Sequence, residues 1–344
     1  MIRFLTTALL LALATAPAAA TPAEAAAPAA EPAAAPAPEA VTLREWPVPW
    51  ETSRPRDPYV APDGRVWFVG QRGDYLAWLD PESGEMGRHE LPAGTGPHNL
   101  IVDGEGRVWY AGNRAAHVGR LDPASGAIEK VATPKEGAGD PHTLVFGNGG
   151  TIWFTAQGGN SVGRLDPATG EVRLVPVPTQ RARPYGIVVD AEGRPWLTLF
   201  GTHKLARVDP AAMTLEEIAL PRPDARPRRL AVAPDGRVWY VDYAKGFLGR
   251  YDPADGSFAE WPVPGGGEAR PYGMAIDDRG RLWLVETGSE PNRLVGFDPA
   301  AERFFAVTPI ESGGGSVRHM VFHAPSRALW FGTDANTIGR AQVP

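Results

Sequence analysis

From residue 41 onward, short apolar stretches alternate with polar turns, and no stretch sustains the 3.6-residue periodicity of a helix. One repeat shows the arrangement. β-Branched and aromatic residues concentrate in 97–103, 107–112, 117–123 and 127–134, and turns containing glycine, proline or aspartate separate these stretches. The pattern predicts four short antiparallel strands in each repeat.

A tryptophan recurs at the same place in the second predicted strand of each repeat. The seven copies are Trp67, Trp109, Trp153, Trp196, Trp239, Trp283 and Trp330. Successive copies lie 42, 44, 43, 43, 44 and 47 residues apart, and a strand-rich period of this length is typical of a propeller. We therefore predict an all-β, seven-bladed β-propeller with four antiparallel strands per blade, in which the tryptophans pack between blades.

The last repeat lacks a fourth strand, because the sequence stops after the third-strand phrase "TIGRAQVP". The stretch 41–49, "VTLREWPVP", precedes the first inner strand and matches the missing piece. We expect this N-terminal strand to pair as the outermost strand of the last blade. Such pairing closes the ring and leaves no open edge there.

The first forty residues do not follow the repeat. Residues 1–20 combine a basic start at Arg3, a short apolar core over 4–14 and three alanines at 18–20, which predicts a secretory signal peptide. Residues 21–40 form an Ala/Pro-rich linker that we expect to be disordered. The propeller should span 41–344. We expect a periplasmic or secreted protein with no transmembrane span in its mature part.

Composition narrows the chemistry. The 344 residues include no cysteine, which excludes disulfides, thiolate metal sites and cysteine nucleophiles. The formal charge of −6 and the short arginine clusters give no indication of nucleic-acid binding. A closed ring needs no partner to complete it, so we expect a monomer.

Chemistry-bearing residues recur where the inner strands begin. These starts should meet at one mouth of the central channel, which is the default binding site of a propeller. The predicted ring is Tyr59, His98, His142, Tyr185, Arg228, Tyr272 and His319. We expect a small-molecule or peptide ligand at this mouth.

Two carboxylates follow the second strands of the last two repeats, Glu286 in "LWLVETG" and Asp334 in "LWFGTDAN". They should lie near His319 and Tyr272. Such a group can bind a divalent cation through its oxygens and present a general base.

The phrases "RPYGIVVDAEGRPWLT" (183–198) and "RPYGMAIDDRGRLWLVETG" (270–288), together with "SVGRLDP" (161–167), resemble the streptogramin B lyase family over the whole region from 41 to 344. The resemblance implies a seven-bladed propeller and a carbon–oxygen lyase. Such an enzyme opens the lactone of a cyclic depsipeptide antibiotic by elimination, assisted by Mg²⁺ and a histidine base.

The family's site residues carry over only in part. Its "RPH" phrase corresponds to Arg270, Pro271 and Tyr272, where tyrosine replaces histidine. Its "EPHG" phrase corresponds to 317–320, which keeps His319 but has Val317 at the glutamate. The resemblance thus implies His319 as the base, Tyr272 as an acid or orienting group, and Asp334 with Glu286 as ligands of Mg²⁺.

Two other functions remain open. A calcium-dependent lactone hydrolase would also use a propeller mouth, and its candidate ligands here are Glu286, Asn113, Asn336 and Asp242. A non-catalytic propeller could instead bind a peptide, a glycan or an envelope protein through the ring of tyrosines, histidines and Arg228. Chelation should abolish the first activity and leave the second unchanged.

Overall fold

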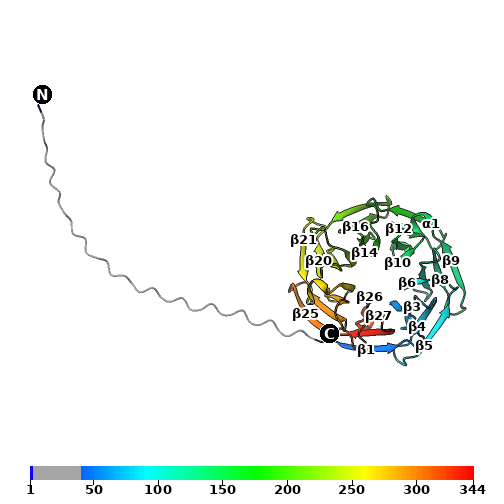
Figure 1. Cartoon of the computed structure of the whole chain (residues 1–344). Coiled ribbons are helices and arrows are strands. Elements are labelled where there is room, and N and C mark those ends of the chain that lie inside the picture. The colour runs from blue at the N-terminus through cyan, green and yellow to red at the C-terminus, as the bar shows by residue number, and fades with distance from the viewer. Residues whose placement is uncertain (3–39) are drawn as a thin grey trace. The chain divides into compact units, whose positions relative to one another are not determined.

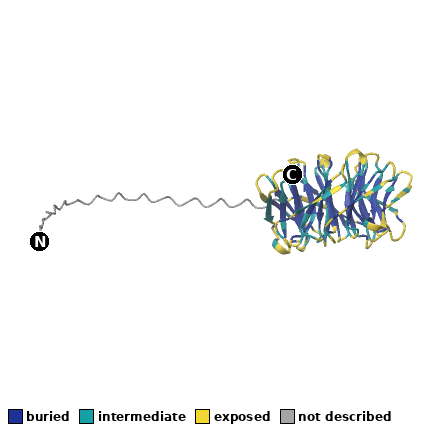
Figure 2. Cartoon of the chain, turned by 90° about the horizontal axis from the view of Figure 1, so that it is seen from above, coloured by how far each residue is buried: buried dark blue, intermediate teal, exposed yellow. Residues whose placement is uncertain are grey.

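The computed structural model describes residues 1–2 and 40–344. The longer part holds seven four-stranded antiparallel sheets, which surround a central channel as blades (Figures 1 and 2). The prediction of an all-β, seven-bladed propeller is confirmed. The signal peptide predicted over 1–20 and the linker predicted over 21–40 fall, but for residues 1, 2 and 40, outside the described residues. In the described part of the chain, no helix is long and apolar enough to cross a membrane.

Each blade runs from an inner strand at the channel to an outer strand at the rim. The inner strands are β2 (Pro55–Val60), β6 (Pro97–Val102), β10 (Pro141–Phe146), β14 (Pro184–Val189), β18 (Pro227–Val232), β22 (Pro271–Ile276) and β26 (Val317–His323). The second strands are β3 (Val66–Gly70), β7 (Val108–Gly112), β11 (Ile152–Ala156), β15 (Pro195–Leu199), β19 (Val238–Asp242), β23 (Leu282–Glu286) and β27 (Ala328–Thr333).

The third strands are β4 (Tyr75–Leu79), β8 (His117–Leu121), β12 (Ser161–Leu165), β16 (Lys204–Asp209), β20 (Phe247–Tyr251), β24 (Arg293–Asp298) and β28 (Thr337–Gln342). The outer strands are β5 (Met86–Glu90), β9 (Ile128–Ala132), β13 (Val172–Pro176), β17 (Thr214–Ala219), β21 (Phe258–Pro262), β25 (Arg303–Pro309) and β1 (Thr42–Pro47). Within residues 40–344, single helical turns lie in the connections between strands, at α1 (Lys135–Ala138), η1 (Asn148–Gly150), η2 (Gly266–Glu268) and η3 (Ala324–Ser326).

The N-terminal strand closes the ring, as predicted. β1 pairs antiparallel with β28, with Thr42 opposite Gln342 and Trp46 opposite Ile338, and the two lie in the same blade in Figure 1. The indole of Trp46 also stacks on that of Trp330, with ring centroids 5.6 Å apart. The last blade therefore has the same four strands as the other six.

The seven repeated tryptophans pack between blades, which confirms their predicted structural role. All are at most 4% exposed, and each joins the second strand of the next blade in an apolar cluster. Trp67, for example, shares a cluster with Tyr110, and Trp330 shares one with Phe68 of the first blade. In three blades an aspartate six residues earlier accepts the indole N–H, as Asp190 does from Trp196 at 2.9 Å.

Every inner strand bulges near its start. In the second blade Pro97 lies opposite Gly112, but the next pair is Leu100 with Tyr110, so His98 and Asn99 share one opposing residue. Five other blades shift register at the same place, and the first blade shifts one residue later, between Arg56 and Tyr59. A bulge releases two consecutive side chains from strict alternation. The second and third residues of the inner strands both contact neighbouring blades in the channel, and they build the candidate site.

Candidate functional site

Strand register decides which residues are equivalent at the starts of the inner strands. Pro271 lies opposite Glu286 and Val317 lies opposite Thr333, so Val317 stands where other blades have proline. The residues in second place are Arg56, His98, His142, Tyr185, Arg228, Tyr272 and Arg318. The residues in third place are Asp57, Asn99, Thr143, Gly186, Arg229, Gly273 and His319.

The predicted ring was therefore wrong in two places. His319 occupies the third place, and the second place in that blade belongs to Arg318. Tyr59 lies opposite Trp67 near the far end of its strand, because Pro55 and not Pro58 opens it. The correction also affects the resemblance: by register, the position implied for the family's second histidine holds Arg318.

Four members of the ring form a continuous buried row. The imidazoles of His98 and His142 lie 3.6 Å apart between centroids, and the ring of Tyr185 lies 4.4 Å from that of His142. The hydroxyls of Tyr185 and Tyr272 are hydrogen-bonded to each other. All four side chains are at most 6% exposed. The row lies near the end of the channel at which the inner strands begin, which we call the upper mouth.

Asp57 is the centre of the buried polar network. Its Oδ1 accepts from Arg56 Nε at 3.0 Å, and its Oδ2 accepts from Asn99 Nδ2 at 3.0 Å. Arg229 Nη2 lies 3.6 Å from the same Oδ2. Arg229 also donates from Nε to the carbonyl of Arg318 at 3.1 Å and from Nη1 to Thr143 Oγ1 at 3.3 Å. We call these buried side chains, with the row of histidines and tyrosines, the plug.

The plug carries more positive than negative charge. Arg56, Arg228 and Arg229 accompany one buried carboxylate, Asp57. Hydrogen-bond partners are missing for Arg56 Nη2, Arg228 Nε and Arg229 Nη2, all of which are buried. Buried charges are normally paired, so this surplus points to an anion as the complementary group.

Burial and the surplus of arginines shift the pKa values of the neighbouring histidines and of Tyr185. Burial and nearby arginines hold the pKa values of His98 and His142 well below the usual range. Burial, then Arg229, lowers the pKa of His319 to about 4. Burial opposes ionisation of Tyr185, but Arg228, Arg229 and Arg56 outweigh it and lower its pKa to about 8. All three histidines are thus neutral at pH 7.

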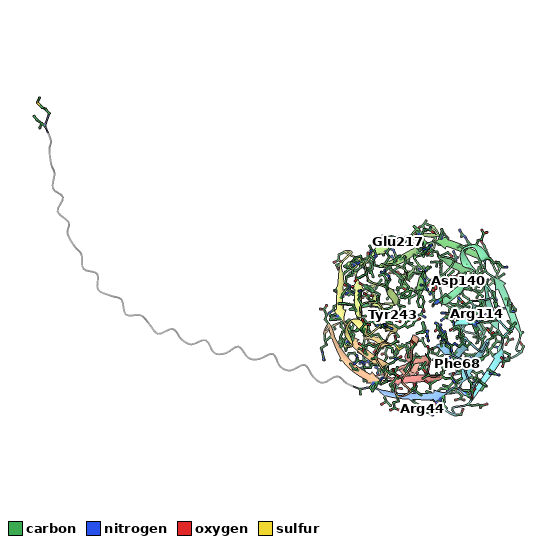
Figure 3. The ribbon with its side chains drawn as sticks, in the orientation of Figure 1. Arg44, Phe68, Arg114, Asp140, Glu217 and Tyr243 are labelled. Carbon is green, nitrogen blue, oxygen red and sulfur yellow. The ribbon has the colours of Figure 1, made fainter. Side chains whose placement is uncertain are left out.

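Arg228 lies among four aromatic rings at the upper mouth. Its guanidinium carbon is 3.7 Å from the ring centroid of Tyr272 and 4.2 Å from that of Tyr243. Phe200 and Tyr185 complete the set at 4.5 and 5.1 Å. Arg228, Phe200 and Tyr243 are half-buried, and Figure 3 labels Tyr243 beside the channel. We call these five residues the aromatic cluster. Aromatic faces attract cations, so the rings hold this guanidinium in place.

Arg270 lies at the rim rather than in the plug. Its side chain is 56% exposed, and its nearest carboxylate is Glu268 at 3.7 Å. Arg54 and Arg318 both pair with Asp334 at the same rim. The upper mouth is therefore rich in arginine, and Asp334 there is already paired.

The two predicted metal ligands do not form a metal site. Glu286 is fully buried and accepts from Gly265 N at 2.7 Å and Arg293 Nε at 2.8 Å. Asp334 receives both terminal nitrogens of Arg318. A carboxylate held by a guanidinium has little affinity left for a hard cation. Within residues 40–344, no group of three acidic or histidine side chains is placed to hold a metal. These residues do not fit Mg²⁺.

The carboxylates considered for a lactone hydrolase are also paired. Asp242 accepts from Arg222 and from the backbone of Arg226, and Glu286 pairs with Arg293. The amide nitrogens of Asn113 and Asn336 donate to the carbonyls of Pro141 and Val48. Both carboxylates would have to leave their arginines to bind calcium.

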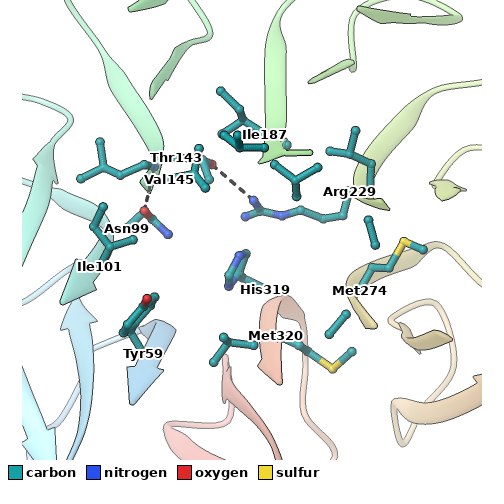
Figure 4. A pocket seen from close by; sticks show the side chains of 18 of the residues that line it. Tyr59, Asn99, Ile101, Thr143, Val145, Ile187, Arg229, Met274, His319 and Met320 are labelled. Carbon is teal, nitrogen blue, oxygen red and sulfur yellow. Dashed lines mark hydrogen bonds between the residues drawn. The ribbon is translucent and has the colours of Figure 1, made fainter. Parts of the chain in front are cut away.

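Below the plug the channel widens into a cavity of about 490 Å³, which we call the lower cavity. The later residues of the inner strands line it, and most are apolar. Its polar side chains are Tyr59 and four residues from the third places of the strands, Asn99, Thr143, Arg229 and His319. Figure 4 shows Arg229 reaching across the cavity to Thr143, with His319 beside it. Tyr59, predicted for the mouth, lines this cavity instead.

Sequence reasoning missed Arg56, Asp57 and Arg229, the charged core of the plug. A signal was present, since "PRD" at 55–57 and "PRR" at 227–229 share the proline-first form of "PHN" and "PHT". Aligning on the proline would have found the second places. The contribution of the third places depends on the bulge, which leaves no mark in the hydropathy pattern.

Comparison with known proteins gives the same architecture. Virginiamycin B lyase from Staphylococcus aureus superposes with a TM-score of 0.79 at 22% identity, covering 88% of this chain and 99% of that one. A catalytically inactive variant of the same enzyme, in a structure with quinupristin, gives the same values. Hydrazine synthase from Kuenenia stuttgartiensis superposes with a TM-score of 0.72 at 15% identity, covering 86% of this chain and 97% of that one. These likenesses show the fold alone.

No curated protein sequence matches the chain. The model of the Virginiamycin B lyase family matches residues 41–341, which is nearly the whole propeller. Blade number, ring closure and this match agree, and the chain belongs to the Virginiamycin B lyase family.

Proposed function

We propose that this member of the family is an exported ligand-binding propeller whose upper mouth takes a small molecule or peptide with an aromatic and an acidic group. One observation carries the proposal: the half-buried Arg228 is held among four aromatic rings, and within residues 40–344 no carboxylate lies within ion-pair distance of it. A guanidinium fixed in this way is preorganised for a ligand carboxylate. The export rests on the sequence of residues 1–20.

The test compares N-acetyltyrosine with its neutral amide by calorimetry on the full chain at pH 7. We expect the carboxylate to bind at least about tenfold more tightly, the usual worth of a charge-assisted hydrogen bond. Arg228→Met should remove that difference. Arg207→Met takes an arginine from the outer face, where it pairs with Glu216, and should leave the difference intact. Equal binding of the two probes, or no effect of Arg228→Met, would contradict the proposal.

A second candidate is ring-opening elimination on a cyclic ester, which family membership favours. His319 is neutral at pH 7 and its Nδ1 has no partner, so it could accept the proton from the carbon adjacent to the one that bears the ester oxygen. A carbon–carbon double bond then forms between these two carbons, and the C–O bond breaks with its electrons leaving on the carboxylate. By register, Arg318 occupies the position implied for the family's second histidine, and the implied metal ligands Glu286 and Asp334 are each paired with an arginine. The low pKa also makes His319 a weak base. We therefore rank binding above catalysis.

Quinupristin separates the two candidates. Incubated with the full chain and followed by liquid chromatography with mass spectrometry, it should keep its retention time and mass if the protein only binds. Elimination would give a product of unchanged mass and new retention time, and hydrolysis would add one water. A product that His319→Gln abolishes would replace binding with catalysis as the function.

A further inference from the structure

The lower cavity differs from the upper mouth in what it offers a ligand. Its walls are the apolar later halves of the inner strands, including Ile187, Met274 and Met320. Several wall residues are only half-buried although they are apolar, among them Val145 and Phe322. The cavity volume of about 490 Å³ falls within the roughly 300–1,000 Å³ of small-molecule sites.

At the inner end of this apolar space lies a buried cation. Arg229 is 3% exposed and lines the cavity, and its Nη2 has no hydrogen-bond partner. The nearest carboxylate, Asp57, is 3.6 Å away and is already held by Arg56 and Asn99. Thr143 Oγ1 adjoins the same guanidinium. The partnerless Nδ1 of His319 adds a second unsatisfied polar atom at this end.

We propose that the lower cavity binds an amphiphilic monocarboxylate, with the carboxylate at Arg229 and the unbranched apolar chain along the cavity walls. The carboxylate supplies the hydrogen-bond partner that Nη2 lacks and balances the surplus of buried arginines. The chain covers apolar wall that otherwise faces water. This site lies across the plug from the aromatic cluster and is independent of the function proposed for the upper mouth.

The test measures dodecanoate, decanoate, octanoate and neutral dodecanol by calorimetry on the full chain at pH 7. Dodecanoate should bind with one-to-one stoichiometry and at least about tenfold more tightly than dodecanol. Each methylene removed should weaken binding by about fourfold, as expected for a buried CH₂ group. These comparisons use only the unaltered protein, so they do not depend on any variant folding.

Three variants locate the site. Arg229→Met should reduce dodecanoate affinity to that of dodecanol, and Val145→Phe should fill the cavity and weaken both ligands at least tenfold. Arg207→Met removes an arginine from the outer face and should change neither. Circular dichroism checks that each variant is folded.

Equal affinity for dodecanoate and dodecanol, or no dependence on chain length, would overturn the proposal. So would dodecanoate binding that a folded Arg229→Met or Val145→Phe variant retains in full. The N-acetyltyrosine measurement on Arg228→Met stands apart from these outcomes, so failure at one end of the channel is distinguishable from failure at the other.

Discussion

The two halves of the inner strands belong to the same seven segments of backbone, yet they make opposite environments. The first halves carry arginine, histidine, tyrosine and aspartate into the plug, and the second halves present valine, isoleucine and methionine to the lower cavity. The bulge lies between them in every blade. The bulge lets two consecutive residues of each strand contact neighbouring blades in the channel, whereas the regular later halves form the apolar wall of the lower cavity. The bulge in the backbone, more than the hydropathy pattern, therefore determines which polar side chains lie in the channel.

The largest expected effect is the loss of stability on replacing Asp57, the one carboxylate of the plug, compared with a replacement in the wall of the lower cavity. Asp57→Asn leaves Arg56 and Arg229 buried without a counter-charge, and we expect the free energy of unfolding to fall by about 3–5 kcal/mol. In the cavity wall, Val321→Thr places a hydroxyl where the side chain is half-buried and should cost less than about 1 kcal/mol. Urea unfolding measures both. Similar losses for the two variants would mean that the halves do not differ energetically as described.

As the pH falls, protonation of the buried histidines should lower the free energy of unfolding before the carboxylates titrate. His98, His142 and His319 have folded pKa values below the unfolded value of about 6.5. Below that pH the unfolded state binds more protons, so stability is complete above about 6.5 and is lost as the pH falls. Each histidine can contribute up to about 1.4 kcal/mol per pH unit. Urea unfolding between pH 7.5 and 4.5 checks the slope, and a flat profile would rule out buried neutral imidazoles.

Two tyrosines provide the finest comparison of the channel's ends. Arginines lower the pKa of Tyr185 in the plug to about 8, whereas burial raises the pKa of Tyr59 in the lower cavity. We expect ultraviolet absorbance to show one tyrosine ionising near pH 8. Tyr185→Phe should remove that step, and Tyr59→Phe should leave it unchanged. A step that survives Tyr185→Phe would assign the low pKa to another residue.

The blades were predictable because every repeat has the same pattern of apolar strands and polar turns, with a tryptophan at the same place in its second strand. The tryptophan register gave seven blades, and the unmatched stretch at 41–49 gave the closing strand. Two residues of the predicted ring are wrong. In the first blade "DPY" resembles the phrases that open the other inner strands, and this favours Tyr59 after Pro58 over Arg56 after Pro55. In the last blade no proline marks the start of the strand, so the sequence does not show that Arg318 rather than His319 takes the second place.

The charged core could not be predicted from a single blade. Asp57, Asn99, Thr143 and Arg229 come from four different blades, and the contacts of Arg229 with Thr143 and Asp57 cross the channel between blades that are not neighbours. The predicted metal ligands do not form a metal site because of contacts within single blades. Glu286 and Asp334 each have an arginine partner in the same blade, Arg293 and Arg318, and side-chain pairing of this kind is not visible in a list of strand ends.

The pairing of β1 with β28 has a consequence for how the chain reaches its folded state. β1 is the first strand of the propeller to be synthesised, and it can pair only after β28, the last strand, has been synthesised, because Thr42 lies opposite Gln342. Until then the six earlier blades form an open array with an exposed edge at each end. The plug draws side chains from the first six blades, and Arg229 also donates to the carbonyl of Arg318 in the last blade. Because Met320 and Val321 of the last blade line the lower cavity, a nascent or prematurely terminated chain can fold blades but lacks a complete lower cavity.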